Sequence, residues 1–198
     1  MKILRSLIVI VLICSGINFA YCADKTLKQY GRTKILPKTG QGSSVSRTGD
    51  DGTYQAGNPT SPRFVDNGNG TISDRLSGLM WVQDPSQIPG GTWGSPGSPS
   101  SMTWNNAIDN SEALTYAGYS DWRLPNIIEL ESIVNYGGSY PAINGTYFLN
   151  TQQDYYWSST TYNVNGSYAL ITRLDDGRTT NFNKGNPGYA RPVRGGGL

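Results

Sequence analysis

The side chains best suited to binding chemistry lie near the C-terminal end of the chain. Aromatic rings pack against the C–H faces of sugars, amides bond pairs of hydroxyls, and guanidinium forks match sulfate or carboxylate oxygens. We take eight residues of these types as candidate ligand-binding residues: Tyr162, Asn163, Asn165, Arg173, Arg178, Asn181, Asn183 and Lys184. The alternative is a solvated hairpin surface whose charges serve solubility.

Catalysis by histidine is excluded by composition. The chain of 198 residues has no histidine, which removes catalytic triads, histidine general bases and histidine metal ligands. Both cysteines, Cys14 and Cys22, lie in the expected export signal. We therefore predict a non-enzymatic protein with no catalytic residues, metal ligands or cofactor. A hydrolase that uses aspartate and glutamate alone stays open as an alternative, since glycosidases need no histidine.

Charge is unevenly distributed along a nearly neutral chain. Residues 24–62 carry six basic and three acidic groups, residues 63–154 carry three and nine, and residues 155–198 carry five and two. An acidic first part and a basic last part can give a domain a dipolar surface. The small total charge and the lack of a recognised motif argue against nucleic-acid binding.

The N-terminal segment has the pattern of an export signal. Lys2 and Arg5 precede an unbroken apolar run over residues 7–13, which is shorter than the ~18 residues that a membrane helix needs. We expect residues 1–23 to be a signal peptide and the protein to reach the periplasm, the cell surface or the medium without a transmembrane anchor. A lipid anchor on Cys22 is disfavoured by the bulky Tyr21.

Two segments follow the signal. Residues 24–62, rich in Gly, Ser, Thr, Lys and Pro, predict a loosely ordered basic arm, and residues 63–198 predict one domain with an insertion loop at 84–101. A hairpin is expected over 63–83, because Asn67-Gly68-Asn69-Gly70 supplies residues that tolerate positive φ. Asp66 alternatively opens a calcium loop, although glycines stand where such a loop needs oxygen ligands.

The remaining pattern favours helices and then strands. Thr103 can cap a helix stopped by Gly118, and Asn126 with Glu129 forms a capping box for a second helix. Strands are expected over 155–160, 167–174, 178–183 and 189–194. This order predicts an α+β fold in which two helices pack on a twisted, mostly antiparallel sheet with long loops.

Five short motifs, spread over residues 63–196, occur in a fixed order. They are Arg63–Thr71, Asp74–Trp81, Asp121-Trp122-Arg123-Leu124-Pro125, Tyr156–Thr160 around Trp157, and Arg191–Gly196 with Arg194. Together they resemble the Lcl C-terminal domain family, named for the C-terminal domain of a bacterial collagen-like adhesin. Motifs that define a diverse family more often form the scaffold, so we assign structural roles to Trp81, Asp121, Trp122, Arg123, Leu124, Pro125, Trp157 and Arg194.

The resemblance implies a C-type-lectin-like fold, which the family shares with formylglycine-generating enzymes. The chemistry of those enzymes uses cysteines that this chain lacks after position 22, and the calcium-lectin tripeptides Glu-Pro-Asn and Gln-Pro-Asp are also missing. The best-known family member is a trimeric adhesin that binds sulfated glycosaminoglycans. A homotrimer is thus implied, although this chain has no Gly-X-Y repeat.

These observations predict a secreted recognition domain that binds extracellular glycans, with sulfated glycans among the candidates. The alternative is an envelope module on a lectin-like scaffold that binds a protein of the envelope or host. Variable loops on the final strands are the expected binding surface in either case.

Overall fold

The computed structural model describes residues 36–43, 49–58, 62–138 and 140–195. The expected signal peptide, the arm up to residue 35 and Gly196 lie outside these residues. Contacts divide the chain into residues 1–32 and 33–198, and every described residue belongs to the second unit. In the described part, every helix is too short or too polar to cross a bilayer.

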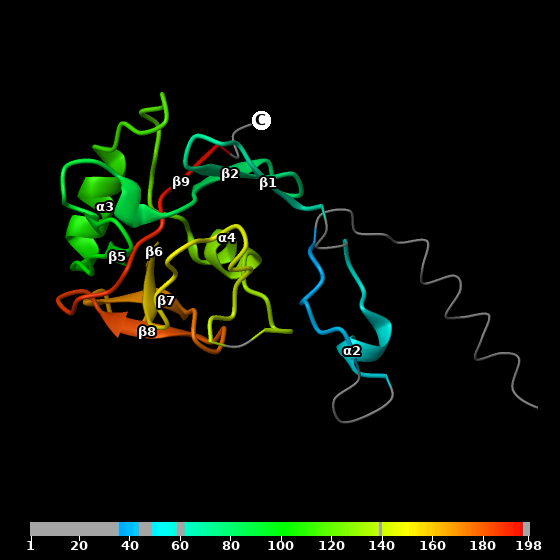
Figure 1. Cartoon of the computed structure of the whole chain (residues 1–198). Coiled ribbons are helices and arrows are strands. Elements are labelled where there is room, and N and C mark those ends of the chain that lie inside the picture. Colours follow the sequence, from blue (N-terminus) through cyan, green and yellow to red (C-terminus); the bar gives the residue numbers. More distant parts are fainter. Residues whose placement is uncertain (1–35, 44–48, 59–61, 139, 196–198) are drawn as a thin grey trace, which may run out of the picture. The chain divides into compact units, whose positions relative to one another are not determined.

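Short helices and strands follow one another in separate runs, as expected of an α+β protein (Figure 1). The helices are α2 (Asp51–Tyr54), α3 (Trp104–Glu112), α4 (Ile127–Ser132) and the 3-10 helix η1 (Pro85–Gln87). The strands are β1 (Phe64–Asp66), β2 (Thr71–Asp74), β3 (Leu79–Val82), β4 (Gly94–Ser95), β5 (Ser98–Pro99), β6 (Tyr155–Thr161), β7 (Tyr168–Arg173), β8 (Thr179–Asn183) and β9 (Val193–Gly195). The predicted α+β class is confirmed.

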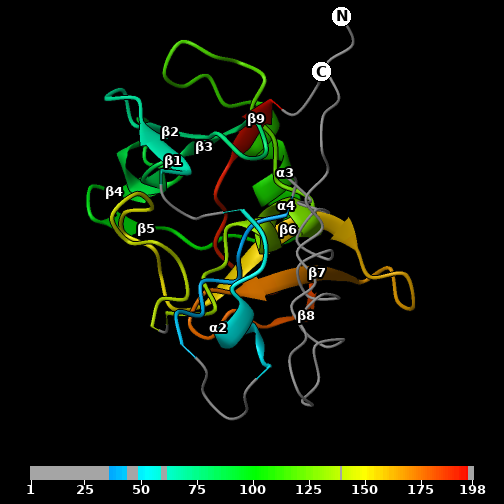
Figure 2. The same cartoon turned by 90° about the vertical axis from the view of Figure 1, so that its right-hand side faces the viewer.

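The strands form separate sheets rather than the single sheet that the sequence predicts. One sheet has the order β1-β2-β3-β9, another the order β6-β7-β8, and β4 pairs with β5 alone. All of these pairings are antiparallel. The division follows from β9, which leaves the final hairpin and pairs with β3 across the domain, as both views show (Figures 1 and 2).

The final strand is shorter than expected because proline interrupts it. Pro192 has no N–H to donate, and its carbonyl accepts from the amide of Val82. Regular pairing with β3 begins only at Val193. Tyr189, at the other end of the expected strand, instead bridges Tyr156 in parallel.

The sheet β6-β7-β8 separates two hydrophobic cores. Tyr156 belongs to the core beneath α4, with Leu130 and Leu174. Trp157, the next residue of β6, belongs to the core beneath α3, with Ala107. Neighbouring residues of a strand point to opposite faces, so the two helices cover opposite faces of this sheet. Figure 1 shows α3 and α4 on either side of β6.

Both main helices stop earlier than the pattern predicts. Tyr116 and Tyr119 bond each other in an antiparallel bridge, which replaces the last expected turn of the first helix. In α4, Val134 bridges Ile143 just after the helix ends. The core contacts come from Ala107 of α3 and from Ile127 and Leu130 of α4, which are buried, and the capping box of Asn126 and Glu129 is present.

The insertion loop and the arm both contain local structure. Trp93, in the insertion loop, is 3% exposed and packs in the core beneath α3. In the arm, the described residues include the single turn α2. The carbonyl of Thr39 accepts a hydrogen bond from the amide of Tyr136 in the domain.

Candidate functional site

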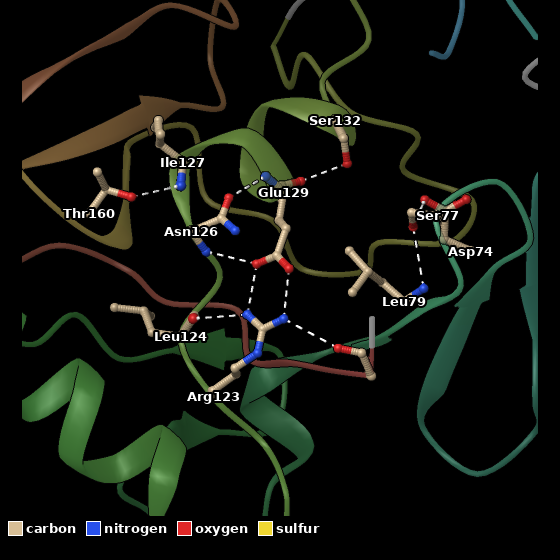
Figure 3. A network of polar contacts seen from close by, with 11 residues as sticks. Asp74, Ser77, Leu79, Arg123, Leu124, Asn126, Ile127, Glu129, Ser132 and Thr160 are labelled. Atoms are coloured by element: carbon tan, nitrogen blue, oxygen red, sulfur yellow. Dashed lines mark hydrogen bonds and ion pairs between the residues drawn. The ribbon is translucent and has the colours of Figure 1, made fainter. Parts of the chain in front are cut away.

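The segment 121–125, the strongest motif of the sequence, is held by ion pairs. Arg123 donates to both carboxylate oxygens of Glu129 at 2.6 and 2.7 Å, and Glu129 also accepts from the amide of Asn126 (Figure 3). Burial alone would raise the pKa of Glu129, but the hydrogen bonds from Arg123 and the Asn126 amide, together with the charge of Arg123, lower it. The guanidinium and the helix cap thus share one carboxylate.

A second ion pair closes the same region. Arg194 donates to the two oxygens of Asp121 at 2.6 and 3.0 Å, and its guanidinium lies 3.8 Å from the centre of the Tyr119 ring. The hydrogen bonds from Arg194 hold the pKa of Asp121 below its ordinary value. This pair ties β9 to the segment before α4.

The motif tryptophans belong to the cores. Trp81, Trp122 and Trp157 are buried, and so is Leu124. The indole N–H of Trp157 donates to the carbonyl of Met102 at 2.9 Å. The indole rings of these three tryptophans are enclosed in the cores.

Seven of the eight candidate binding residues lie at two ends of the sheet β6-β7-β8. One group, here called the turn end, is Arg173 and Arg178 beside the β7–β8 turn. The other, here called the loop end, comprises the β6–β7 loop and the end of β8, with Tyr162, Asn163, Asn165, Asn183 and Lys184. The strand β7 separates them by about 16 Å at ~3.3 Å per residue. Asn181 lies within β8 between the two ends.

The two arginines of the turn end lie opposite each other. The amide of Arg173 donates to the carbonyl of Arg178 at 2.8 Å, so both side chains share one face of the hairpin. Arg173 pairs with Asp175, and Arg178 pairs with Asp176 at 2.9 Å. Each positive charge is therefore balanced by an aspartate of the same turn.

The loop end presents a cation with a different environment. The ammonium group of Lys184 lies 3.7 Å from the centre of the Trp104 ring and donates to the hydroxyl of Thr161 at 2.8 Å. Among the described residues, no carboxylate lies within ion-pair distance of it. Asn163 and Asn165 are exposed in the neighbouring loop, and Tyr162 is half-buried.

A groove opens between α3 and the segment that precedes α4. It has a volume of about 320 Å³ and is lined by Ile108, Glu112, Arg123, Leu124, Asn126 and Ser159. Ile108 lies one helical turn after Trp104, whose ring contacts Lys184 of the loop end. The groove is therefore next to the loop end. Sequence reasoning missed this groove, because its residues come from three separate segments.

Sequence reasoning also missed Arg191, which is fully buried. Its guanidinium donates to the carbonyls of Val82, Gln83 and Leu149 and to the hydroxyl of Thr151. Burial lowers the pKa of Arg191 below the ordinary value for arginine. Arg191 stands in the last of the five motifs, which could have drawn attention to it. The sequence does not show that its side chain connects its own segment to residues 82–83 and 149–151.

The Asp66 loop is occupied by hydrogen bonds of its own. One oxygen of Asp66 accepts from the amide of Gly68 at 2.8 Å, and the other accepts from the side chain of Gln83 at 3.0 Å. The side chain of Asn69 accepts from the hydroxyl of Thr71. These contacts describe the β1–β2 turn. In the described residues, no three acidic side chains come together as metal ligands.

Comparison with known protein families identifies one family model that matches this chain. The family model described as "Lcl C-terminal domain" matches residues 70–194, from the β1–β2 turn to the last strand. No curated protein matches the chain. The matched residues contain the loop end, the turn end and the groove.

Proposed function

The chain belongs to the Lcl C-terminal domain family, a family associated with surface adhesins, and from this premise we propose that it is an exported, non-enzymatic recognition domain that binds extracellular glycans. We further propose that the loop end makes the contact. The observation that carries this proposal is the Lys184 ammonium group, which a ring and a hydroxyl hold in place but no described carboxylate neutralises.

The loop end fits a sugar better than the turn end does. A sulfate or carboxylate of a glycan meets Lys184 without displacing a carboxylate, whereas at Arg173 and Arg178 it competes with an aspartate. The exposed amides of Asn163 and Asn165 can bond hydroxyls, although the side chain of Asn165 also accepts from the amide of Ser167. We therefore assign any anionic group of the glycan to Lys184.

Three carboxylates that pair with arginines are unsuited to act as the acid of a hydrolase. A glycosidase needs a carboxylic acid with a raised pKa as its proton donor. The pKa values of Asp74, Asp121 and Glu129 are lowered instead, and each of these groups pairs with an arginine. These three groups are structural.

An array of neutral, carboxylated and sulfated glycans, probed with the purified chain at low and high salt, tests the proposal. We expect binding that weakens about tenfold in Lys184→Ala, since a hydrogen bond to a charged group contributes ~1.5–3 kcal/mol. Asn163→Ala should weaken it less. Arg178→Ala is the matched control, because that exposed cation is already paired with Asp176.

Either of two results contradicts the proposal. No binding to any glycan removes the glycan function. Binding that falls in Arg178→Ala and not in Lys184→Ala moves the site to the turn end. Circular dichroism of each variant establishes that the loss reflects the contact rather than the fold.

The turn end favours a second candidate function, protein binding. Tyr136 and Tyr140 are 49% and 65% exposed. They flank the β7–β8 turn: the amide of Tyr140 donates to the carbonyl of Asp175, and the ring of Tyr136 lies beside Gly177. Tyrosine and arginine are enriched at the centres of protein interfaces. Pull-down with Tyr140→Ala against unmodified protein distinguishes this surface from the loop end.

A further inference from the structure

The groove beside α3 carries a negative charge that the described chain leaves unbalanced. Two charged side chains line it, Arg123 and Glu112. Arg123 is neutralised by the two hydrogen bonds to Glu129 (Figure 3). Glu112 is exposed, and among the described residues it has no hydrogen-bond or ion-pair partner. The net charge of the groove is therefore that of a carboxylate.

The position of Glu112 strengthens this field. It is the last residue of α3, and the last turn of that helix contains no basic residue. The C-terminal end of a helix carries a partial negative charge from its unpaired carbonyls. A carboxylate placed there is repelled, and a cation that binds it relieves the repulsion. The groove thus favours a positively charged group.

The other lining residues describe the body of the ligand. Ile108 and Leu124 give an apolar surface, and the Ser159 hydroxyl and the Asn126 side-chain N–H groups have no partner among the described residues. An apolar wall beside free hydroxyl and amide groups matches a sugar ring, which has a C–H face and a rim of hydroxyls. The volume of about 320 Å³ is at the lower end of the ~300–1,000 Å³ usual for small-ligand sites.

We propose that this groove binds an amino sugar, with its ammonium group on Glu112 and its ring against Ile108 and Leu124. The site goes beyond the proposed function, because it needs no contact with Lys184 or the β6–β7 loop. It also differs in the sign of its charge, since the loop end presents a cation and the groove a carboxylate.

Titration of the full chain with glucosamine, N-acetylglucosamine and glucose, followed by backbone amide NMR shifts, tests the proposal. At about pH 6 the amine of glucosamine is protonated, since amines beside electron-withdrawing carbons have pKa values of about 7.7. We expect glucosamine to bind about tenfold more tightly than the other two sugars. The shifts should centre on Ile108, Leu124 and Ser159.

Variants on one helix give the matched comparison. Glu112→Gln should abolish the preference for glucosamine and leave a weak affinity common to the three sugars. Asp109→Asn removes an exposed carboxylate of α3 that does not line the groove, so it should keep the preference. Because Glu112 has no described contact, Glu112→Gln should fold normally, which its thermal midpoint checks.

Three outcomes overturn the proposal. The first is a lack of glucosamine-dependent shifts at the groove. The second is a preference for glucosamine that persists in Glu112→Gln. The third is equal or tighter binding of Nα-acetyl-lysine amide, whose free ε-ammonium group stands for the side chain of a protein ligand. Lys184→Ala should leave glucosamine binding unchanged, so the result does not depend on the function of the loop end.

Discussion

Residues that combine charge with burial stabilise the first sheet of this domain. Arg63 and Asp74 form a pair whose side chains are 4% and 0% exposed, with N–O distances of 2.5 and 2.8 Å. Arg63 also donates to the carbonyl of Ser132, at the end of α4. Removing one partner of such a pair leaves the other buried charge without a partner. The resulting loss of folding stability exceeds the stability that the pair itself contributes.

The Asp74 pair predicts an acid-sensitive fold. Burial alone would raise the pKa of Asp74, but the hydrogen bonds and charge of Arg63 lower it below the ordinary value of 3.8. A depressed folded pKa contributes stability above the unfolded pKa, and that contribution is lost as the pH falls through the folded pKa. We expect the free energy of unfolding in urea to fall below about pH 4.

Two variants test this prediction. Asp74→Asn should lower the free energy of unfolding at neutral pH by about 3–5 kcal/mol and flatten its decline in acid. Asp109→Asn, at an exposed carboxylate of α3, should keep the profile of the unmodified protein. A steep acid transition that persists unchanged in Asp74→Asn would assign the effect to other carboxyl groups.

Among the elements, α4 has the most complete set of end contacts. It has only six residues, too few for a stable isolated helix. Asn126 accepts from the amide of Glu129, and Glu129 accepts from the amide of Asn126 and from Arg123. The first turn is thereby fixed to the segment 121–125, and Leu130 is placed in the core. A short helix is held here by its cap and by its buried face.

Asn126→Ala should destabilise the protein by about 1 kcal/mol, because it removes the acceptor of the cap. Urea unfolding measures this difference. Asn105→Ala is the matched control, since Asn105 is exposed within α3, where alanine is the better helix former. That control should leave stability unchanged or slightly higher. An equal loss in both variants would show that the cap is not the cause.

At the scale of the whole domain, β6 couples the two cores. Its neighbouring residues Tyr156 and Trp157 are fully buried on opposite faces of one sheet. β3 repeats the arrangement, with Trp81 in one core and Val82 in the other. Loss of packing on one face therefore disturbs strands that the other face needs.

This coupling predicts one cooperative unfolding transition. Leu130→Ala in the core beneath α4 and Ile171→Ala in the core beneath α3 should each shift the whole transition, by about 2–5 kcal/mol. Far-UV circular dichroism and tryptophan fluorescence should report the same midpoint in each variant. Val164→Ala, at a side chain 76% exposed, should change nothing. Separate midpoints for the two probes would mean that the cores unfold independently.

The sequence by itself determined the local features, because their causes are local. Turn residues after Asp66 predicted the first hairpin, Asn126 and Glu129 predicted their capping box, and five ordered motifs predicted the family. It also excluded histidine chemistry outright, because the chain has no histidine. It did not determine how far helices and strands extend. Tyr116 bonds Tyr119 instead of continuing the helix, and Pro192 accepts from Val82 of a strand that is distant in sequence.

Tertiary structure alone decided how the surface is arranged. A β-strand alternates its side chains, but only its pairing register shows that Arg173 and Arg178 share a face and that aspartates balance them. The candidate residues are close in sequence, and yet seven of the eight lie at two ends of a sheet, because β7 is extended. The groove depends on three segments that meet only after folding. Whether Glu112 has an ion-pair partner is therefore decided by the fold, because the residues that surround its side chain in space are not its neighbours in the sequence.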